Sequence, residues 1–178
     1  CHNFNYRTDY FEDENLAKAW KEEGHSGNWE VPTTWQKVQE VTKFLKGKKI
    51  NGMDAHGYLD PLKGWGGFGF YFLGSRATAY AKHPDDPAFL FDADTMKPRV
   101  NNPAWVRAIQ DVLDVLDCQP ADQINADPGT TGFQQFLAGT GSMLSWWGDI
   151  GSNANTSDSS IIMGNVGFDI LPGSDDVY

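Results

Sequence analysis

The sequence has few cysteines, few basic residues and no long apolar segment. Its two cysteines, Cys1 and Cys118, show neither CxxC nor zinc-ligand spacing. The sequence leaves open whether these cysteines form a disulfide in an oxidising compartment or stay as two buried thiols.

Lys and Arg number 14 against 24 Asp and Glu, which gives a formal net charge of -10. This balance argues against nucleic acid and anionic membranes as partners, because both require clustered cations. No run of 18 apolar residues occurs, so we expect no membrane-spanning helix.

Recognisable catalytic motifs are also missing. The sequence contains no GxSxG, HExxH or P-loop, and the glycine-rich run 64–69 lacks the Gly-Lys-Ser/Thr ending of a phosphate loop. None of the four histidines stands four residues from another, so we predict no metal site and no cofactor; they are His2, His25, His56 and His83. A pair of glycosidase carboxylates stays possible on the residues alone, because such pairs meet in space and not in sequence.

Aromatic residues are abundant. They make up 13% of the chain and include seven Trp and eleven Phe. With 40% hydrophobic and 21% charged residues, the chain has a globular composition, and 178 residues suffice for one domain with a full core. Part of the aromatic content must therefore be core, but seven Trp leave room for a binding surface as well.

Hydrophobic periodicity predicts several helices interleaved with short strands, which places the chain in the α/β class. We expect strands at 2–7, at 142–146 and within 161–173. We expect helices from Thr8 or Asp9 to near Gly24, at 33–46, 68–83, 101–117 and 129–138. Residues 25–32 and 152–160 are predicted as loops, and 84–100 as a surface excursion with one short strand.

The clearest helix signal lies at 101–117. Asn102 is the expected N-cap and Pro103 occupies the first helical position. The apolar stripe that we expect to face the core consists of Val106, Ile109, Val112 or Leu113, and Leu116.

Tryptophans beside polar loop residues suggest a binding site. A pyranose ring presents an apolar C–H face that stacks on indole, while its hydroxyl groups require carboxylate, amide or backbone partners. We therefore predict a ligand site made of Trp65, Trp146, Trp147, Gly148 and Asp149. The alternatives are that the tryptophans belong to the core or an interface, and that Asp149 caps the turn that follows it.

The adjacent pair Trp146–Trp147 must point to opposite faces if residues 142–146 form a strand. Leu144 and Trp146 then share one face, whereas Met143, Ser145 and Trp147 share the other. Because Leu144 accompanies Trp146, we expect Trp146 to point inward and Trp147 to stack on the ligand.

Five segments, in the same order along the chain, resemble segments of family 1 extracellular solute-binding proteins, the sugar-type receptors of ABC importers. They are FNYRTDYFEDENL (4–16), VPTTWQKVQEVTKFLKG (31–47), VNNPAWVRAIQDVLDVL (100–116), FQQFLAGTGSMLSWWGDIG (133–151) and VGFDILPG (166–173). The resemblance covers most of the chain. It implies one lobe of a type II periplasmic-binding-protein-like fold, with a short mixed sheet flanked by helices.

The family's proteins have two lobes with a ligand cleft between them, and the resemblance covers only the second. We therefore expect residues 1–178 to form a single ligand-binding lobe, a piece of a longer receptor whose first lobe is missing here. The implied function is non-catalytic binding of a solute, most simply a carbohydrate, for delivery to an ABC transporter permease. The implied location is periplasmic or extracellular, with or without a membrane tether. Two other functions stay open: a sensor or adaptor lobe that binds protein through its aromatic face, and a carbohydrate hydrolase.

Overall fold

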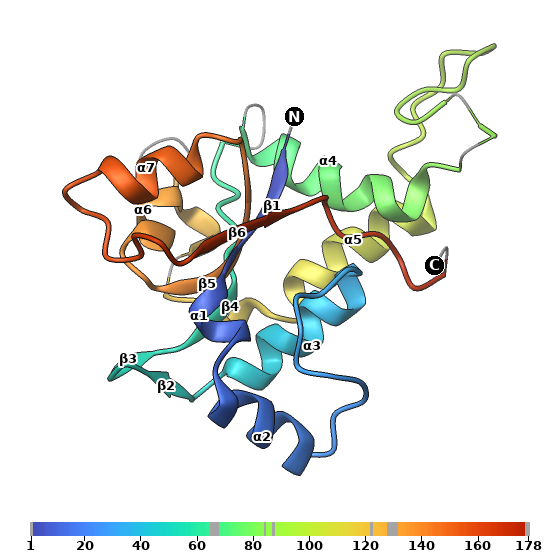
Figure 1. Cartoon of the computed structure of the whole chain (residues 1–178). Helices are drawn as coiled ribbons and strands as arrows, with labels where there is room; N and C mark the ends of the chain where they lie inside the picture. Colours follow the sequence, from blue (N-terminus) through green and yellow to red (C-terminus); the bar gives the residue numbers. More distant parts are fainter. Residues whose placement is uncertain are drawn as a thin grey trace.

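A four-stranded mixed sheet forms the centre of the molecule (Figure 1). The computed structural model describes residues 2–64, 68–83, 85–86, 88–121, 123–127 and 132–176. The strand order is β4-β5-β1-β6, with β1 antiparallel to β5 and β6 and with β4 parallel to β5. The strands are β1 (Asn3–Arg7), β4 (His56–Tyr58), β5 (Gly141–Trp146) and β6 (Val166–Asp169). A mixed sheet with flanking helices confirms the predicted α/β class.

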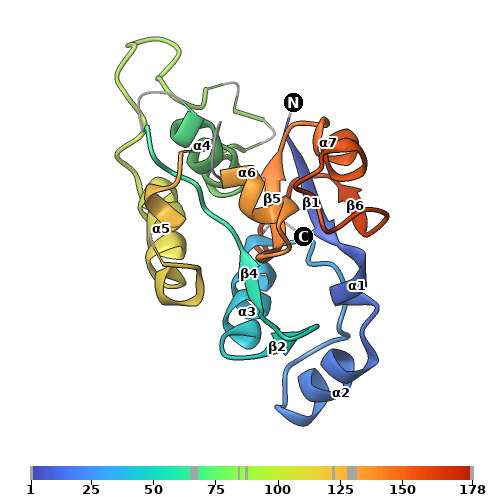
Figure 2. The same cartoon turned by 90° about the vertical axis from the view of Figure 1, so that its left-hand side faces the viewer.

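Helices cover both faces of this sheet (Figures 1 and 2). α3 (Trp35–Leu45) packs on β4, while α6 (Phe133–Leu137) packs on β5 and α7 (Ile150–Thr156) on β6. α4 (Phe68–Ala81) and α5 (Pro103–Leu113) lie against each other. The smaller elements are α1 (Thr8–Phe11), α2 (Glu14–Glu22), the hairpin β2 (Lys49–Ile50) and β3 (Met53–Asp54), and the 3₁₀ turns η1 (Leu116–Cys118) and η2 (Gln123–Asn125). No helix among the described residues is long and apolar enough to cross a bilayer.

The core has three clusters, and β5 contributes to two of them. Met143 belongs to the first cluster, together with Phe4 of β1 and residues of α2 and α3. Leu144 and Trp146 belong to the second cluster, with Phe136 and residues of α7. The third cluster joins α4 to α5. The alternation predicted for residues 142–146 is confirmed, and both faces of the strand are buried.

One helix was predicted between residues 8 and 24, but the chain forms two. α1 ends at Phe11, and Asp13 caps α2 by accepting hydrogen bonds from the backbone N–H groups of Asn15 (2.8 Å) and Leu16 (2.9 Å). Thr8 and Asp9, the expected caps, both lie inside α1, whose start has no side-chain cap in the described chain. The Arg7 guanidinium, two residues away, engages the Asp9 carboxylate at 2.7 Å, so the prediction of the cap was wrong because a local ion pair competes for this group.

Residues 150–156 form helix α7, whereas 152–160 were predicted as a loop. The segment is rich in Asn, Ser and Gly, which favour turns over helices. Ile150 and Ala154 stand four residues apart and are both fully buried in the second cluster. Packing of these two side chains stabilises a helix that local preference does not favour.

α5 begins as predicted but packs on a different face. Asn102 accepts a hydrogen bond from the backbone N–H of Trp105 at 3.1 Å, and Pro103 is the first helical residue. The buried apolar residues are Trp105, Ala108 and Val112. The other stripe residues are exposed: Val106 by 59%, Ile109 by 43%, Leu113 by 49% and Leu116 by 37%. The predicted core face was therefore wrong apart from Val112. The large Trp105 ring directs the helix, because it stacks on Phe70 of α4 and on Phe89.

The remaining local predictions hold in part. α3 starts after Thr34, whose hydroxyl accepts from the Lys37 N–H at 3.3 Å, and Gly47 has the left-handed φ of 78° that stops it. The helix predicted at 101–117 ends at Leu113 and is followed by η1. In the described part of 84–100, an isolated bridge between Phe91 and Pro98 stands where a short strand was predicted. Cys118 is a buried free thiol, while Cys1 and residues 129–131 of the fifth expected helix lie outside the described residues.

Candidate ligand-binding site

Trp146 is a core residue of β5. Its side chain belongs to the second cluster and the residue is 5% exposed. The indole stacks on Phe72 of α4 (centroids 5.6 Å apart, planes at 19°) and lies 5.1 Å from the Phe133 ring. The expected inward orientation is confirmed. Contact of Trp146 with a ligand stays a prediction, and little of its surface is accessible to one.

Trp147 lies at the end of β5, half-buried, where the sheet meets the start of α4. Its ring stands edge-on to His2 (4.5 Å, 89°) and to Phe72 (5.9 Å, 81°). It is also perpendicular to Trp146 at 5.1 Å. The ring is therefore fixed by aromatic neighbours and keeps part of its surface in solvent, which is the state that a stacking residue requires.

Sequence reasoning missed four residues near Trp147, namely His2, Tyr71, Phe72 and Ser75. His2 precedes β1 and stacks on Phe72 (5.1 Å, 14°), and its Nδ1 lies 3.0 Å from the Ser75 hydroxyl. Tyr71 is 56% exposed and lies edge-on to His2 at 6.3 Å. His2 is 73 residues from Ser75, so no local pattern could bring them together. Exposed aromatic residues at the start of a predicted buried helix were the only available signal.

We define the aromatic rim as His2, Tyr71, Phe72 and Trp147 together with Ser75. It joins the N-terminal end of β1, the C-terminal end of β5 and the first half of α4, which lie at one end of the sheet in Figure 1. Burial lowers the pKa of His2 from its usual 6.5, so the imidazole is neutral at neutral pH. The rim can thus offer ring faces and a neutral imidazole to a ligand. The Ser75 hydroxyl donates to the Tyr71 carbonyl at 2.7 Å and lies 3.0 Å from His2 Nδ1, so toward a ligand it can act only as an acceptor.

Gly148 and Asp149 follow the rim and are exposed. A Cβ placed on Gly148 would meet only the Asn3 side chain, at 3.4 Å, so the chain itself does not require glycine there. Asp149 precedes α7, and within the described part of the chain its carboxylate makes no capping hydrogen bond to the helix. It accepts instead from the Asn153 side chain at 3.1 Å. The capping alternative is wrong, whereas the ligand roles of both residues stay predictions.

Trp65, the remaining member of the predicted site, lies outside the described residues. Its ligand role stays a prediction. The histidines do not gather: His25 contacts Glu40, His56 contacts the Cys118 carbonyl, and His2 contacts Ser75. No group of three or more His, Cys, Asp or Glu in the described ranges is arranged to hold a metal ion.

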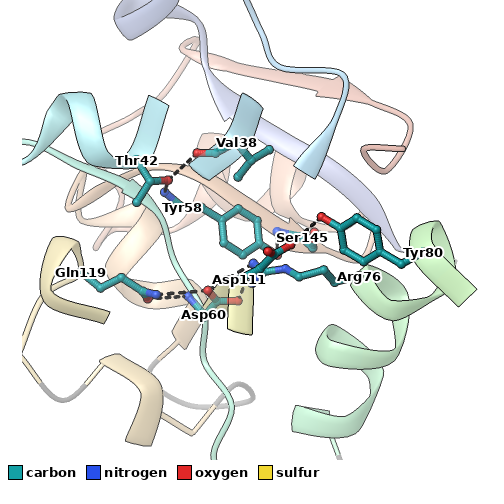
Figure 3. A network of polar contacts seen from close by, with 9 residues as sticks. All are labelled: Val38, Thr42, Tyr58, Asp60, Arg76, Tyr80, Asp111, Gln119 and Ser145. Carbon is teal, nitrogen blue, oxygen red and sulfur yellow. Dashed lines mark hydrogen bonds and ion pairs between the residues drawn. The ribbon is translucent and has the colours of Figure 1, made fainter. Parts of the chain in front are cut away.

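Behind the rim, α4 is held by a buried ion pair (Figure 3). The Arg76 guanidinium contacts both carboxylate oxygens of Asp60, at 3.0 and 3.2 Å, and both residues are 3% exposed. Gln119 donates to the Asp60 carboxylate (3.1 Å) and accepts from the Asp60 backbone N–H (2.8 Å). Burial raises the pKa of Asp60 against the opposing effect of Arg76.

Aromatic rings complete the surroundings of this pair. The guanidinium lies over the rings of Trp35 (4.6 Å) and Tyr58 (5.2 Å). The Tyr58 hydroxyl accepts from the Ser145 N–H at 3.3 Å, which ties the network to β5. Because the pair is fully enclosed, we assign it to the positioning of α4 and not to ligand contact.

The arrangement of the elements defines the class: the chain has the fold of one lobe of a solute-binding protein. No family model matches the sequence, and no curated protein matches it. Several solved structures are similar to this chain. An ABC transporter solute-binding protein from Agrobacterium vitis S4 with bound D-mannitol superposes with a TM-score of 0.69 at 20% identity, over 98% of this chain and 37% of its own.

Two further structures are similar. A solute-binding protein from Agrobacterium radiobacter K84 in complex with ribitol has a TM-score of 0.60 at 22% identity, over 98% of this chain and 38% of its own. The maltose-bound T. maritima MalE3 has a TM-score of 0.60 at 19% identity, over 97% of this chain and 38% of its own. The chain thus spans little more than a third of these proteins. At these identities the similarity establishes the fold.

Proposed function

We propose that the chain is the ligand-binding lobe of a two-lobed solute-binding protein that delivers a carbohydrate or polyol to an ABC importer. The observation that carries the proposal is the aromatic rim, where Trp147 and Tyr71 keep accessible ring surface beside the Ser75 hydroxyl. Neighbours of the same fold bind D-mannitol, ribitol and maltose, which present C–H surface and hydroxyl groups together. The rim offers partners for both kinds of surface.

In this proposal the lobe does no chemistry on its ligand. Trp147, Tyr71 and Trp65 supply stacking surface, with Trp146 supporting them from the core, while Gly148 and Asp149 supply backbone and carboxylate partners to hydroxyl groups. The first lobe closes over the ligand, and the closed form is recognised by the permease. The complete protein resides in the periplasm or outside the cell, free or tethered to the membrane.

The test is calorimetry on both the complete receptor and the 178-residue chain, with D-mannitol, ribitol, maltose and other neutral sugars. We expect a micromolar ligand of the complete receptor, about -8 kcal/mol, to fall to the millimolar range, about -4 kcal/mol, in the lobe alone. The reason is that the lobe retains about half of the contacts. Equal affinity for both proteins would contradict the half-site, and no binding by the complete receptor would contradict carbohydrate binding.

An assay with aryl-glycosides tests whether the receptor hydrolyses glycosidic bonds. We expect the complete receptor to release no aryl alcohol above the buffer rate. Turnover that Asp149→Asn abolishes would instead assign the chain to the hydrolases.

A further inference from the structure

A continuous apolar face of α5 is left uncovered by the described chain. Val106, Ile109 and Leu113 follow one another at spacings of three and four residues, so they form one row along α5, and Leu116 in the following turn η1 is exposed as well. Each is more than a third exposed, whereas Trp105, Ala108 and Val112 bury the adjacent face of the helix against α4. We call this row the outer face of α5. An exposed apolar row beside the packed face of a helix indicates an interaction surface.

The surface beside this row is hollowed. A hollow of about 380 Å³ lies at Ile109 and Leu113, and its apolar lining is completed by Leu62, Leu73, Val112 and Ile124. A second hollow, of about 590 Å³, lies at Val106 beside Asn102, Pro103 and Gln110. The two hollows share no lining residue and lie at the two ends of α5. We call them together the seam, and apolar hollows spaced along a helix fit the side chains of another helix.

Most charged groups around the seam are paired within the chain. Arg107 donates to Asp111 at 2.7 Å, and Gln110 donates to Asp114 at 2.6 Å. Lys46 contacts Asp117 at 2.5 Å, beside Leu116. Lys63, which also lines the first hollow, has no ion-pair partner among the described residues. The outer face therefore offers a partner mainly apolar contact with one ammonium group at its edge, which favours an amphipathic helix over a charged ligand.

The length of the similar proteins indicates which segment covers the outer face of α5. This chain covers 37% of the mannitol-binding structure and 38% of the ribitol-binding one, so most of each polypeptide has no counterpart in the present sequence. Asp176 lies near enough to Arg107 to act on it electrostatically, and neither it nor any other described residue covers the row. We propose that the outer face of α5 docks an amphipathic helix from the part of the receptor outside this sequence. The inference rests on the proposed receptor function.

Cysteine labelling tests the proposal without depending on the stability of a variant. Leu113→Cys and Ile109→Cys are compared with Asp114→Cys, an exposed polar position at the end of the same helix that lines neither hollow, in both the 178-residue chain and the complete receptor. The probe is a maleimide, and peptide mapping separates the new thiol from Cys1 and Cys118. We expect residues 109 and 113 to react at least about tenfold more slowly in the complete receptor, and residue 114 to change less than about twofold.

Equal rates at residue 113 in both proteins would overturn the proposal. Protection in the 178-residue chain itself that disappears on dilution would overturn it too, and would assign the face to a second copy. Sugar binding is measured separately on the same preparations. Protection without sugar binding supports helix docking and contradicts the proposed ligand, whereas sugar binding without protection contradicts only the docking.

Discussion

At the scale of single residues, the two adjacent tryptophans differ in their surroundings. Trp146 stacks on Phe72 inside a core cluster, while Trp147 reaches the end of the strand with part of its ring in solvent. The two rings were predicted to lie on opposite faces, but Trp147 follows the end of β5 and packs against the same cluster and the same Phe72 ring as Trp146. They differ in burial, so of the two we expect Trp147 to meet a ligand at the aromatic rim.

Alanine at each position separates these roles. We expect Trp146→Ala to cost about 3–5 kcal/mol of unfolding free energy, because it empties a large volume in the core. Trp147→Ala should cost less, about 1–3 kcal/mol, since part of that residue is already in solvent. In the complete receptor Trp147→Ala should weaken sugar binding by about 1–3 kcal/mol, by analogy with stacking of bases on aromatic rings.

Thermal melts and binding isotherms on both variants check this pair of expectations. Phe168→Ala, which truncates an aromatic residue that is 46% exposed on β6, is the matched control and should leave sugar affinity unchanged. Unfolding by Trp147→Ala together with a stable Trp146→Ala protein would reverse the assignment. Unchanged affinity in Trp147→Ala would remove this residue from the site.

His2 makes the rim sensitive to pH. Burial lowers its pKa below 6.5 in the folded state, so the unfolded chain takes up the proton first as the pH falls. The contribution of neutral His2 is therefore complete above pH 6.5 and is lost as the pH falls below it. The ring stacks on Phe72 and contacts Ser75, and a charged imidazole would weaken this packing.

We expect His2→Phe, which keeps the stacking but cannot be protonated, to lose less melting temperature between pH 7 and pH 5 than the unaltered chain. His83 has a side chain 70% exposed and provides the control. His83→Gln should show the same pH response as the unaltered chain. A His2→Phe response as steep as that of the unaltered protein would show that another group causes the acid sensitivity.

At the scale of elements, local signals predict where a helix starts better than which face it buries. Asn102 and Pro103 mark the start of α5 because capping acts through neighbouring backbone N–H groups. The buried face depends on Trp105, whose partners Phe70 and Phe89 are distant in sequence. The apolar row of α5 is real, but within the described chain nothing covers it.

The candidate site, too, could be predicted from the sequence only where its residues are set by local features. The end of β5 at Trp147 could be predicted, because alternation and the following Gly148-Asp149 are local features. His2, Tyr71 and Ser75 could not, since only the packing of α4 against the start of β1 brings them to this point. Likewise α7 forms because Ile150 and Ala154 find a core, and its Ser- and Asn-rich sequence does not reveal that.

At the scale of the whole molecule, α4 connects all three core clusters. Phe72 belongs to the cluster of Trp146, Leu73 and Ala77 belong to the cluster of α5, and Arg76 lies over Trp35 and Tyr58 of the first cluster. The rim residues Tyr71 and Ser75 are on the same helix. The position of the candidate site therefore depends on the anchoring of α4 by the Asp60–Arg76 pair (Figure 3).

Removing one partner of this pair should be more damaging than removing both charges. We expect Arg76→Met to cost about 3–5 kcal/mol of unfolding free energy, because it leaves the Asp60 carboxylate buried without its cation. Asp60→Asn combined with Arg76→Met should cost less than the sum of the two single changes, since neither charge then remains unpaired.

Denaturant titrations of the unaltered chain, the two single variants and the double variant measure this coupling between Asp60 and Arg76. Lys46→Met is the control at the solvent-exposed Lys46–Asp117 pair and should change stability little. Additive losses in the double variant would mean that Asp60 and Arg76 stabilise α4 independently. In that case the three clusters would be joined by apolar packing of α4 and not by its buried charge.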